Sequence, residues 1–360
     1  MLTEQFIQAV TPQQTGTHYP ATSDRVVLSE SMPLPPLAEQ KRIVATVEAL
    51  LTRVNAARER LAKVPAILRR FRQSVLAAAC SGQLTADWRQ CRPDQQRIQV
   101  DREQGPDGPF DLPTSWRWTR FEDLVASIRS GSTAVPKLEE TRFPILRSSS
   151  VRPGAVDLAD VRYVEESESR NQENFLRDAD LLFTRLSGSV DYVANCAIVR
   201  GLAKRRIQYP DRLFRVRLHD ARHSAYVERV FHAPFLRKVI TETAKSSAGH
   251  QRVSQGDITN QLIPLPLVGE QAEIVRRVED LFALADKIEA RVQAATARVE
   301  KITQAILAKA FRGELVPTEA ELACQEGRDY EPASVLLERI RAADQTDHGK
   351  QAARRRRRQR

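Results

Sequence analysis

Apolar residues recur at alternating steps of four and three in two long segments of the chain. Such steps keep one narrow apolar stripe on a single side of a helix, which is the pattern of a coiled-coil seam. Each stripe spans a helix roughly 50 Å long, so we expect two long helices that pack on each other. The seam positions are Ile43, Val47, Leu50, Val54, Ala57, Leu61, Val64, Leu68, Phe71 and Val75, then Ile274, Val278, Leu281, Ala285, Ile288, Val292, Ala295, Val299, Ile302 and Ile306.

The two segments are copies of each other. PLPPLAEQKRIVATVEAL, which starts at Pro33, aligns with PLPLVGEQAEIVRRVEDL, which starts at Pro264, and the repeat continues without a gap to SGQL in the first copy and RGEL in the second. The prolines prevent each helix from extending backwards. Gly82 and Gly313 stand where a helix C-cap is expected. One helical element therefore occurs twice, at 33–84 and 264–317.

The region between the copies has a different pattern. Residues 85–111 are rich in proline, glycine and charge, which is typical of a linker. From Leu112 to Ile263 there are short apolar runs such as FPILRS, DLLFTRL, NCAIVRG and RLFRVRL, with a helical stretch near 225–244. This mixture predicts an α+β fold: a mixed α/β domain at 112–263 inserted between two long helices that form an antiparallel coiled coil. Residues 1–32 are too short for a domain, and the charged tail at 318–360 is expected to be disordered.

The positive charge is unevenly distributed. The chain has 56 Lys and Arg against 46 Asp and Glu, a net charge of +10. The final KQAARRRRRQR carries seven positive charges and no negative ones, and residues 115–263 carry 24 basic against 18 acidic side chains. A basic domain on near-neutral helices favours contact with nucleic-acid phosphates. Cys80, Cys91, Cys196 and Cys324 form no CxxC pair, which predicts a reducing, cytoplasmic location without disulfides.

Several motifs together resemble the specificity (S) subunits of type I restriction-modification systems. Both junctions match the family's Pro-Leu-Pro, Glu-Gln, Ile-Val pattern, at Pro33–Val44 and Pro264–Val275. LPTSW at 112–116 resembles the opening of a target recognition domain, and SGST at 130–133, FTRLSGSV at 183–190 and GHQRVS at 249–254 resemble its later turns. The order of these motifs around a doubled junction makes the resemblance specific.

The resemblance implies a non-catalytic, DNA-binding subunit. Its recognition domain would read one half of a bipartite DNA target, and its helices would dock methyltransferase (M) subunits and, through the complex, restriction (R) subunits. S-adenosylmethionine, ATP and Mg would be bound by those partners, so no cofactor is expected on this chain. Family members carry two recognition domains. Here residues 1–32 leave room only for the remnant of a first one, so self-association of the chain is possible.

Other function classes find less support in the sequence. The chain has no Asn/Asp-Pro-Pro-aromatic methyltransferase motif and no phosphate-binding loop, so we expect no enzyme activity from it alone. His219 and His223 are four residues apart but have no third ligand nearby, so no metal site is expected. The remaining alternative is a coiled-coil scaffold, or an inactive truncated relic without a working DNA-reading role.

The candidate site residues are side chains that read bases or that recur in the two junctions. Arginine reads guanine, amides read adenine, and small hydroxyls read either. The predicted DNA-binding residues are Arg129, Ser130, Arg147, Ser148, Ser149, Ser150, Arg185, Ser187, Ser189, His250, Gln251 and Arg252. The predicted subunit-interface residues are Glu39, Gln40, Gln73, Glu270, Gln271 and Gln304.

Overall fold

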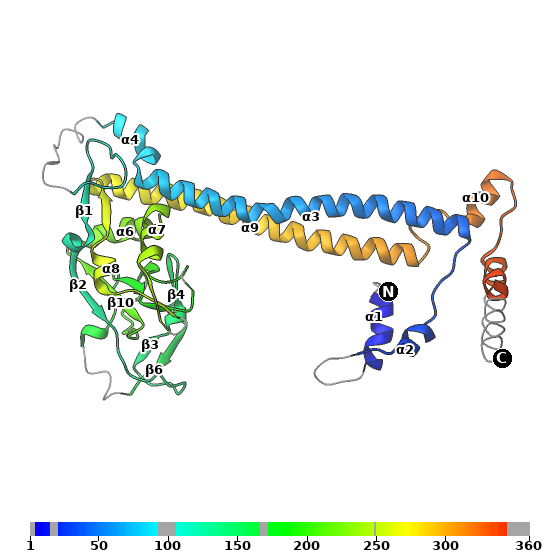
Figure 1. Cartoon of the computed structure of the whole chain (residues 1–360), viewed down its shortest axis with the longest axis horizontal. Coiled ribbons are helices and arrows are strands. Elements are labelled where there is room, and N and C mark those ends of the chain that lie inside the picture. The colour runs from blue at the N-terminus through cyan, green and yellow to red at the C-terminus, as the bar shows by residue number, and fades with distance from the viewer. Residues whose placement is uncertain are drawn as a thin grey trace, which may run out of the picture. The chain divides into compact units, whose positions relative to one another are not determined.

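The computed structural model describes residues 4–14, 21–92, 106–165, 172–189, 191–247 and 250–343. The chain forms two compact units, residues 1–65 with 288–360 (unit 1) and residues 66–287 (unit 2). Two helices of 44 residues each, α3 (Leu37–Cys80) and α9 (Val268–Phe311), contribute to both units (Figure 1). None of the helices in these ranges is long and apolar enough to cross a membrane.

The ends of the long helices follow from their proline and glycine signals. Helix α3 begins directly after Pro36, and α9 begins two residues after Pro266. Gly82 and Gly313 follow the helix ends with φ of 78° and 73°, in the left-handed region that glycine adopts at low cost. In unit 1 the start of α3 lies by the end of α9, and in unit 2 the end of α3 packs with the start of α9. The predicted α+β class with antiparallel long helices is confirmed.

The apolar seam is more regular on α3 than on α9. All ten seam positions of α3 are buried or half-buried, whereas Ile288 and Ile302 of α9 are 37% and 42% exposed. An α-helix has 3.6 residues per turn, so a stripe of period 3.5 drifts around it and some positions move to the margin. The sequence therefore overstated the continuity of the second stripe.

Unit 1 contains four further α-helical segments in its described part. These are α1 (Glu4–Val10), α2 (Asp24–Ser29), α10 (Glu319–Glu326) and a helix over residues 333–343, and a 3₁₀ turn at Thr11–Gln13 follows α1. Helix α10 falls in the segment for which disorder was expected, so that expectation is wrong for these residues. Thr318 and Glu321 form a capping box at its start, and Arg42 of α3 binds Glu319 at 2.6 Å. The predicted arginine tail lies outside the described residues.

Unit 2 is built around a four-stranded antiparallel sheet. Its strand order is β2 (Val125–Ser130), β10 (Leu213–Leu218), β7 (Leu181–Thr184) and β9 (Cys196–Ile198). Alternate residues of these strands enter two different cores, because successive side chains point to opposite faces. Leu181 and Phe183 face a core shared with helices α6 (Ser224–Phe231) and α7 (Pro234–Thr243), and Leu182 faces a smaller core on the other side.

The two ends of the inserted region meet beside α9. Strand β1 (Arg117–Arg120) pairs antiparallel with β13 (Leu262–Leu265), which leads directly into α9. Helix α8 (Gln255–Thr259) precedes β13, and α4 (Ala86–Gln90) follows the end of α3. The remaining strands form small sheets: β3 (Pro144–Leu146) with β6 (Val161–Tyr163), β4 (Val151–Arg152) with β5 (Ala155–Val156), and β11 (Lys245–Ser247) and β8 (Leu186–Ser187) on either side of β12 (His250–Arg252).

Candidate nucleic-acid interface

Two separate predicted segments meet at the main-chain oxygen of Asp211. It accepts hydrogen bonds from the Ser130 hydroxyl at 3.2 Å and from the Arg185 guanidinium at 3.3 Å. The Arg185 amide donates to the main-chain oxygen of Arg212 at 2.9 Å, and the Arg185 guanidinium lies 5.5 Å from the ring centre of Phe214. We call Arg129, Ser130, Arg185, Asp211 and Arg212 the Asp211 cluster.

A glycine allows these segments to approach. A Cβ atom on Gly131 would lie 2.1 Å from the main-chain oxygen of Tyr209 and 2.5 Å from that of Pro210, so any side chain there would force the two segments apart. The amide of Ser132 donates to the Tyr209 oxygen at 2.9 Å, and the Asp211 amide donates to the Ser132 oxygen at 2.8 Å. The Ser-Gly-Ser turn is therefore held against the start of β10.

The third predicted segment joins the same cluster through backbone pairing. Strand β12 pairs antiparallel with β8, with Gln251 opposite Ser187, and the Val253 amide donates to the Arg185 oxygen at 3.1 Å. Arg252 is exposed. The side chain of His250 lies outside the described side chains.

The hydroxyls of Ser187 and Ser189 each accept a hydrogen bond from a nearby backbone amide. The Ser189 amide donates to Ser187 at 3.2 Å, and the Asp191 amide donates to Ser189 at 3.3 Å. A hydroxyl that accepts a bond keeps its own proton for donation, so both side chains can still donate to a ligand. Arg129 is half exposed and lies 3.8 Å from the Glu173 carboxylate, which also lies 3.8 Å from Arg217. The three arginines of this cluster therefore stand beside two acidic side chains, Asp211 and Glu173.

The remaining predicted segment forms a second group around Asp160. Arg147 binds the Asp160 carboxylate at 3.1 Å, and the Ser149 hydroxyl donates to it at 3.2 Å. The Ser150 hydroxyl donates to the main-chain oxygen of Asp160 at 2.6 Å. Partial burial raises the pKa of Asp160, but the bonds from Arg147, Ser150 and Ser149 outweigh it and hold this pKa below its usual range.

This arrangement corrects part of the predicted DNA-binding set. Ser150 is 1% exposed and its hydroxyl is used inside the protein, so it is in no position to read a base. Ser148 is half-buried, and Arg147 keeps 46% of its side chain exposed while paired with Asp160. A cavity of about 410 Å³ opens here, lined by Arg147, Ser149, Ser150, Arg152, Ala155, Asp157 and Asp160.

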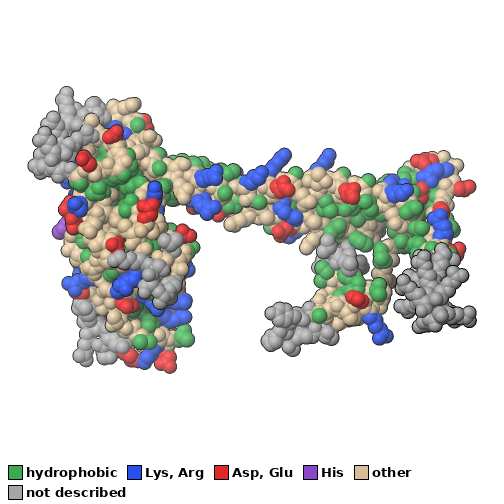
Figure 2. All heavy atoms as spheres, viewed as in Figure 1, with side chains coloured by type: hydrophobic (Ala, Val, Ile, Leu, Met, Phe, Trp, Pro, Cys, Tyr) green, Lys and Arg blue, Asp and Glu red, His purple; other side chains and the backbone are tan. Residues whose placement is uncertain are grey.

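The two groups lie against one chain segment. The Leu146 amide donates to the Gln208 oxygen, and the Gln208 amide donates to the Pro144 oxygen, both at 2.9 Å. The next residues along the chain, Tyr209 to Asp211, bind the Ser-Gly-Ser turn. Residues 207–213 therefore connect both groups. On the face of the inserted domain seen in Figure 2, basic side chains are interspersed with acidic ones.

The predicted interface residues divide into buried and exposed ones. Glu270 is 1% exposed and accepts bonds from the Trp116 indole at 2.9 Å, from the Thr85 hydroxyl at 2.7 Å and from Arg89. Gln271 is also 1% exposed and bonds to His223 at 2.9 Å. These two side chains are occupied within unit 2, which contradicts a direct role in binding another subunit.

The first-copy counterparts of these residues are less fully occupied. Glu39 is 5% exposed and accepts a bond from the Glu319 amide at 2.8 Å, while the half-buried Gln40 donates to the Pro35 oxygen at 2.8 Å. Gln73 and Gln304 are exposed on α3 and α9 and stay predicted interface residues.

The sequence analysis did not identify Arg212, nor Asp160 and Asp211, which accept hydrogen bonds from the predicted side chains. Arg212 is exposed and directly follows Asp211. The sequence offered one indication of Arg212: it directly precedes the alternating pattern LFRVRL, which forms strand β10. Asp160 and Asp211 had no such signal, because their partners come from distant parts of the chain.

Comparisons with known proteins identify the family. No protein-family profile matches the chain. It is 40% identical over 339 residues to the type I restriction enzyme EcoKI specificity subunit of Escherichia coli (strain K12), covering 93% of this chain and 68% of that protein. It is 32% identical to the StySPI specificity subunit of Salmonella potsdam, covering 93% and 67%.

Solved structures have the same fold. One, described as the basis of complex assembly and conformational transition of the type I R-M system, is 24% identical with a TM-score of 0.65 and covers 87% of this chain and 69% of its own. The HsdS subunit from Thermoanaerobacter tengcongensis is 25% identical with a TM-score of 0.51 and covers 86% and 68%. The doubled junction, the inserted α+β domain and the 40% identity lead to one conclusion: the chain belongs to the specificity subunits of type I restriction enzymes.

Proposed function

We propose that this chain is the non-catalytic subunit that gives a type I restriction-modification complex its DNA sequence specificity. Its region 112–263 reads one half of a bipartite target, and its long helices dock the methyltransferase subunits, through which the restriction subunits join. S-adenosylmethionine, ATP and Mg belong to those partners. The complex acts in the cytoplasm.

The observation that carries this proposal is the Asp211 cluster together with strand β12, which pairs beside it. Three segments far apart in the sequence bring the backbones of Arg129, Arg185 and Arg252 near one another. Arginine is the side chain best suited to guanine edges and to phosphates. The serine hydroxyls in these segments can both donate and accept hydrogen bonds, so they can contact more than one kind of base.

The test measures DNA binding by the full-length chain in complex with its methyltransferase. The complex is first used to select its preferred duplex from a random library. We then compare Arg185→Ala with Arg222→Ala, which removes an exposed arginine bonded to Asp220 in the turn at Ala221–His223. A lost base contact costs about 1–3 kcal/mol, so Arg185→Ala should weaken binding roughly 5- to 150-fold and relax the selected sequence at one position.

Two results would count against the proposal. If the selection returns no preferred DNA sequence, the chain does not read DNA sequence as proposed. A selected sequence that Arg185→Ala, Arg129→Ala and Arg252→Ala all leave unchanged would place the reading surface elsewhere on the chain. Docking is tested separately by co-purification of the methyltransferase with Gln73→Arg and Gln304→Arg variants, both of which should bind it less.

A further inference from the structure

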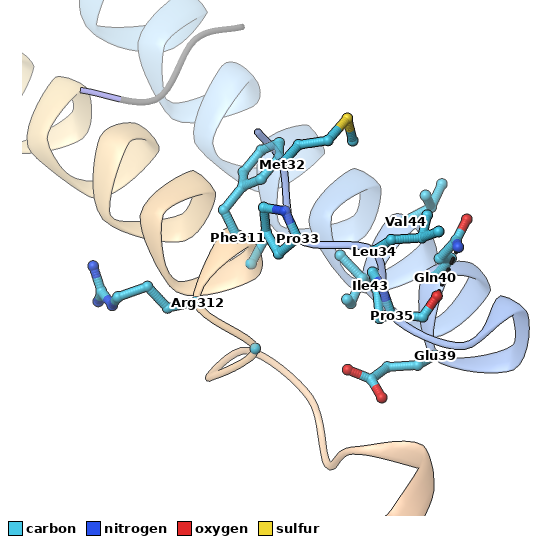
Figure 3. Close-up of a pocket in the computed structure, with 12 residues that line it drawn as sticks. Met32, Pro33, Leu34, Pro35, Glu39, Gln40, Ile43, Val44, Phe311 and Arg312 are labelled. Carbon is cyan, nitrogen blue, oxygen red and sulfur yellow. Dashed lines mark hydrogen bonds between the residues drawn. The ribbon is translucent and has the colours of Figure 1, made fainter. Parts of the chain in front are cut away.

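One buried positive charge in unit 2 has no hydrogen-bonded anion. The cavity of about 460 Å³ at the start of α3 differs from this site, because its lining is mostly apolar, with Phe311 beside Pro33 in Figure 3. The Glu39 carboxylate at its margin already accepts the Glu319 amide. In contrast, Arg215 of β10 is 0% exposed, and its Nη2 has no hydrogen-bond partner among the described residues. A buried guanidinium in this state costs free energy, so Arg215 calls for an anion.

Two further arginines lie on the same face of the sheet. Arg215 is directly opposite Arg129 of β2. Residues opposite each other on antiparallel strands point to the same side of the sheet, and two like charges in such a pair repel. Arg217 is two residues along β10 from Arg215, so its side chain is on this side as well. We call Arg129, Arg215 and Arg217 the arginine triad.

The hydrogen-bond partners of Arg215 inside the protein are neutral. Its Nε donates to the Tyr209 hydroxyl at 3.3 Å, and its Nη1 donates to the Ser127 hydroxyl at 3.4 Å. Arg217 differs, since its Nε donates to the buried Asp180 carboxylate at 2.8 Å. The charges of Arg217 and Asp180 therefore offset each other, whereas Arg215 has no carboxylate at hydrogen-bond distance in the described part of the chain.

A single carboxylate oxygen stands among the three guanidinium groups. Glu173 Oε2 lies 3.8 Å from Arg129 Nε and 3.9 Å from Arg215 Nη2. The same oxygen lies 3.8 Å from Arg217 Nη1. All three distances exceed the roughly 2.7–3.2 Å of a hydrogen bond, so Glu173 attracts the triad without bonding to it through this oxygen. A tetrahedral oxyanion has more oxygens to offer to the same three nitrogens, and phosphate is a preferred partner of arginine.

The Glu173 side chain can turn away without a change in the fold. It is 46% exposed and lies on the 3₁₀ turn Gln172–Asn174. The backbone after this turn is held in place, since the Leu176 amide donates to the Ile207 oxygen at 2.9 Å. A carboxylate that rotates into water regains its hydration, and partly exposed ion pairs are weak. Rotation of this one side chain would therefore uncover the triad at small cost.

We propose that the arginine triad is a phosphate site, and that Glu173 occupies it until a phosphate of the DNA backbone takes its place. Arg129 also belongs to the Asp211 cluster, so this phosphate lies beside the proposed reading surface. A phosphate contact fixes the position of a duplex without reading its sequence. Glu173 is then an internal competitor that lowers the affinity for all DNA. The inference rests on the proposed function only in taking DNA as the source of the phosphate.

The first arm of the test measures this competition directly. The full-length chain is titrated into a short labelled duplex of arbitrary sequence, and binding is followed by fluorescence anisotropy. Glu173→Gln should tighten binding roughly 3- to 10-fold, because the competing charge is gone. Glu122→Gln is the matched control: its carboxylate is 49% exposed and lies 4.0 Å from Arg120, and its removal should leave the affinity unchanged.

An Arg129→Gln background separates displacement from simple repulsion. If Glu173 only repelled DNA through space, Glu173→Gln would tighten binding by the same factor with or without Arg129. Displacement predicts a smaller gain without Arg129, because Glu173 is held by fewer arginines and the phosphate meets fewer of them. Arg129→Gln alone should weaken binding. Far-UV circular dichroism and melting temperatures confirm that each variant is folded.

The second arm tests the site without DNA. Melting temperatures are compared in sodium phosphate and in sodium chloride at equal ionic strength. Phosphate stabilises many proteins because it is excluded from their surfaces, so the result is the difference between variants. Phosphate should raise the melting temperature of Glu173→Gln more than that of the wild-type or Glu122→Gln chain, because its triad is open. The additional Arg129→Gln change should reduce this excess.

Three outcomes overturn the proposal. They are DNA binding that Glu173→Gln does not tighten, an equal gain with and without Arg129, and equal stabilisation of all variants by phosphate. If phosphate stabilises Glu173→Gln preferentially while its DNA affinity stays at the wild-type value, the ligand is free phosphate and the assignment to the DNA backbone is wrong. Neither arm depends on a preferred sequence, so failure here is distinct from failure of the reading role.

Discussion

Replacement of Glu270 by alanine should destabilise unit 2 more than replacement of any exposed carboxylate. Its side chain is 2% exposed and its partner Arg89 is 12% exposed, so the variant leaves a nearly buried guanidinium without its carboxylate. It also removes the acceptor of the Trp116 indole and of the Thr85 hydroxyl. Removal of one partner of a buried ion pair costs about 3–5 kcal/mol, and we expect a loss in that range.

The internal repeat supplies a matched control at Glu39. Glu39→Ala deletes the same group from the same position of the other copy, but among the described residues it removes only one bond, from the Glu319 amide. A single lost cap or backbone hydrogen bond costs about 1–2 kcal/mol. The two variants should therefore differ by about 2–3 kcal/mol, although their residue type, helix position and burial are alike.

Urea denaturation of the full-length chain measures both free energies of unfolding. Trp88, Trp116 and Trp118 are its three tryptophans and all lie in unit 2, so their fluorescence follows that unit. Far-UV circular dichroism follows the helices of both units. Glu270→Ala should lower the fluorescence midpoint strongly, and Glu39→Ala should leave it nearly unchanged.

If Glu270→Ala lowers the free energy of unfolding by no more than Glu39→Ala does, the bonds to Glu270 do not stabilise unit 2 as expected. The contribution of the Trp116 indole hydrogen bond to stability can be measured with Trp116→Phe, which keeps an aromatic ring but removes the donor. Its effect should largely disappear in the Glu270→Ala background, because residues of one hydrogen-bonded group are not additive.

Three further predictions concern other parts of unit 2. Burial lowers the pKa of His232 to about 4, so the folded state binds fewer protons than the unfolded state below the ordinary value of 6.5. Stability should therefore be full above pH 6.5 and fall by up to about 1.4 kcal/mol per pH unit between 6.5 and 4, and His232→Gln should remove this slope in pH-dependent melts. Gly131→Ala should weaken DNA binding and lower the melting temperature because its Cβ would strike backbone 2.1 Å away, whereas Gly188→Ala, with nothing within 4 Å, should leave the melting temperature unchanged. Leu281→Glu should cost several kcal/mol in urea melts, because its side chain packs against the core, whereas Leu284→Glu at a 51% exposed position should be tolerated; equal midpoints would contradict the packing of the helices.

Local patterns in the sequence determined the long helices, their ends and the α+β class. Pro-Leu-Pro before each Glu-Gln and a glycine after each seam act within a few residues, and an apolar period is visible without any knowledge of partners. The repeat and the junction motifs also sufficed to place the chain in its family. The domain boundaries and the DNA-reading residues stay predictions.

Only the tertiary structure decided what individual side chains do. Glu270 looked like a helix-start residue available to other subunits, yet its donors lie 154 and 185 positions away in the chain. Ser149 and Ser150 looked like base readers, but the fold brings Asp160 to their hydroxyls. Hydrogen-bonding groups form their bonds with whatever chain packing brings near, and that proximity leaves no trace in local periodicity. The sequence could therefore indicate which residues have useful chemistry, while the fold decided which of them remain available for a partner.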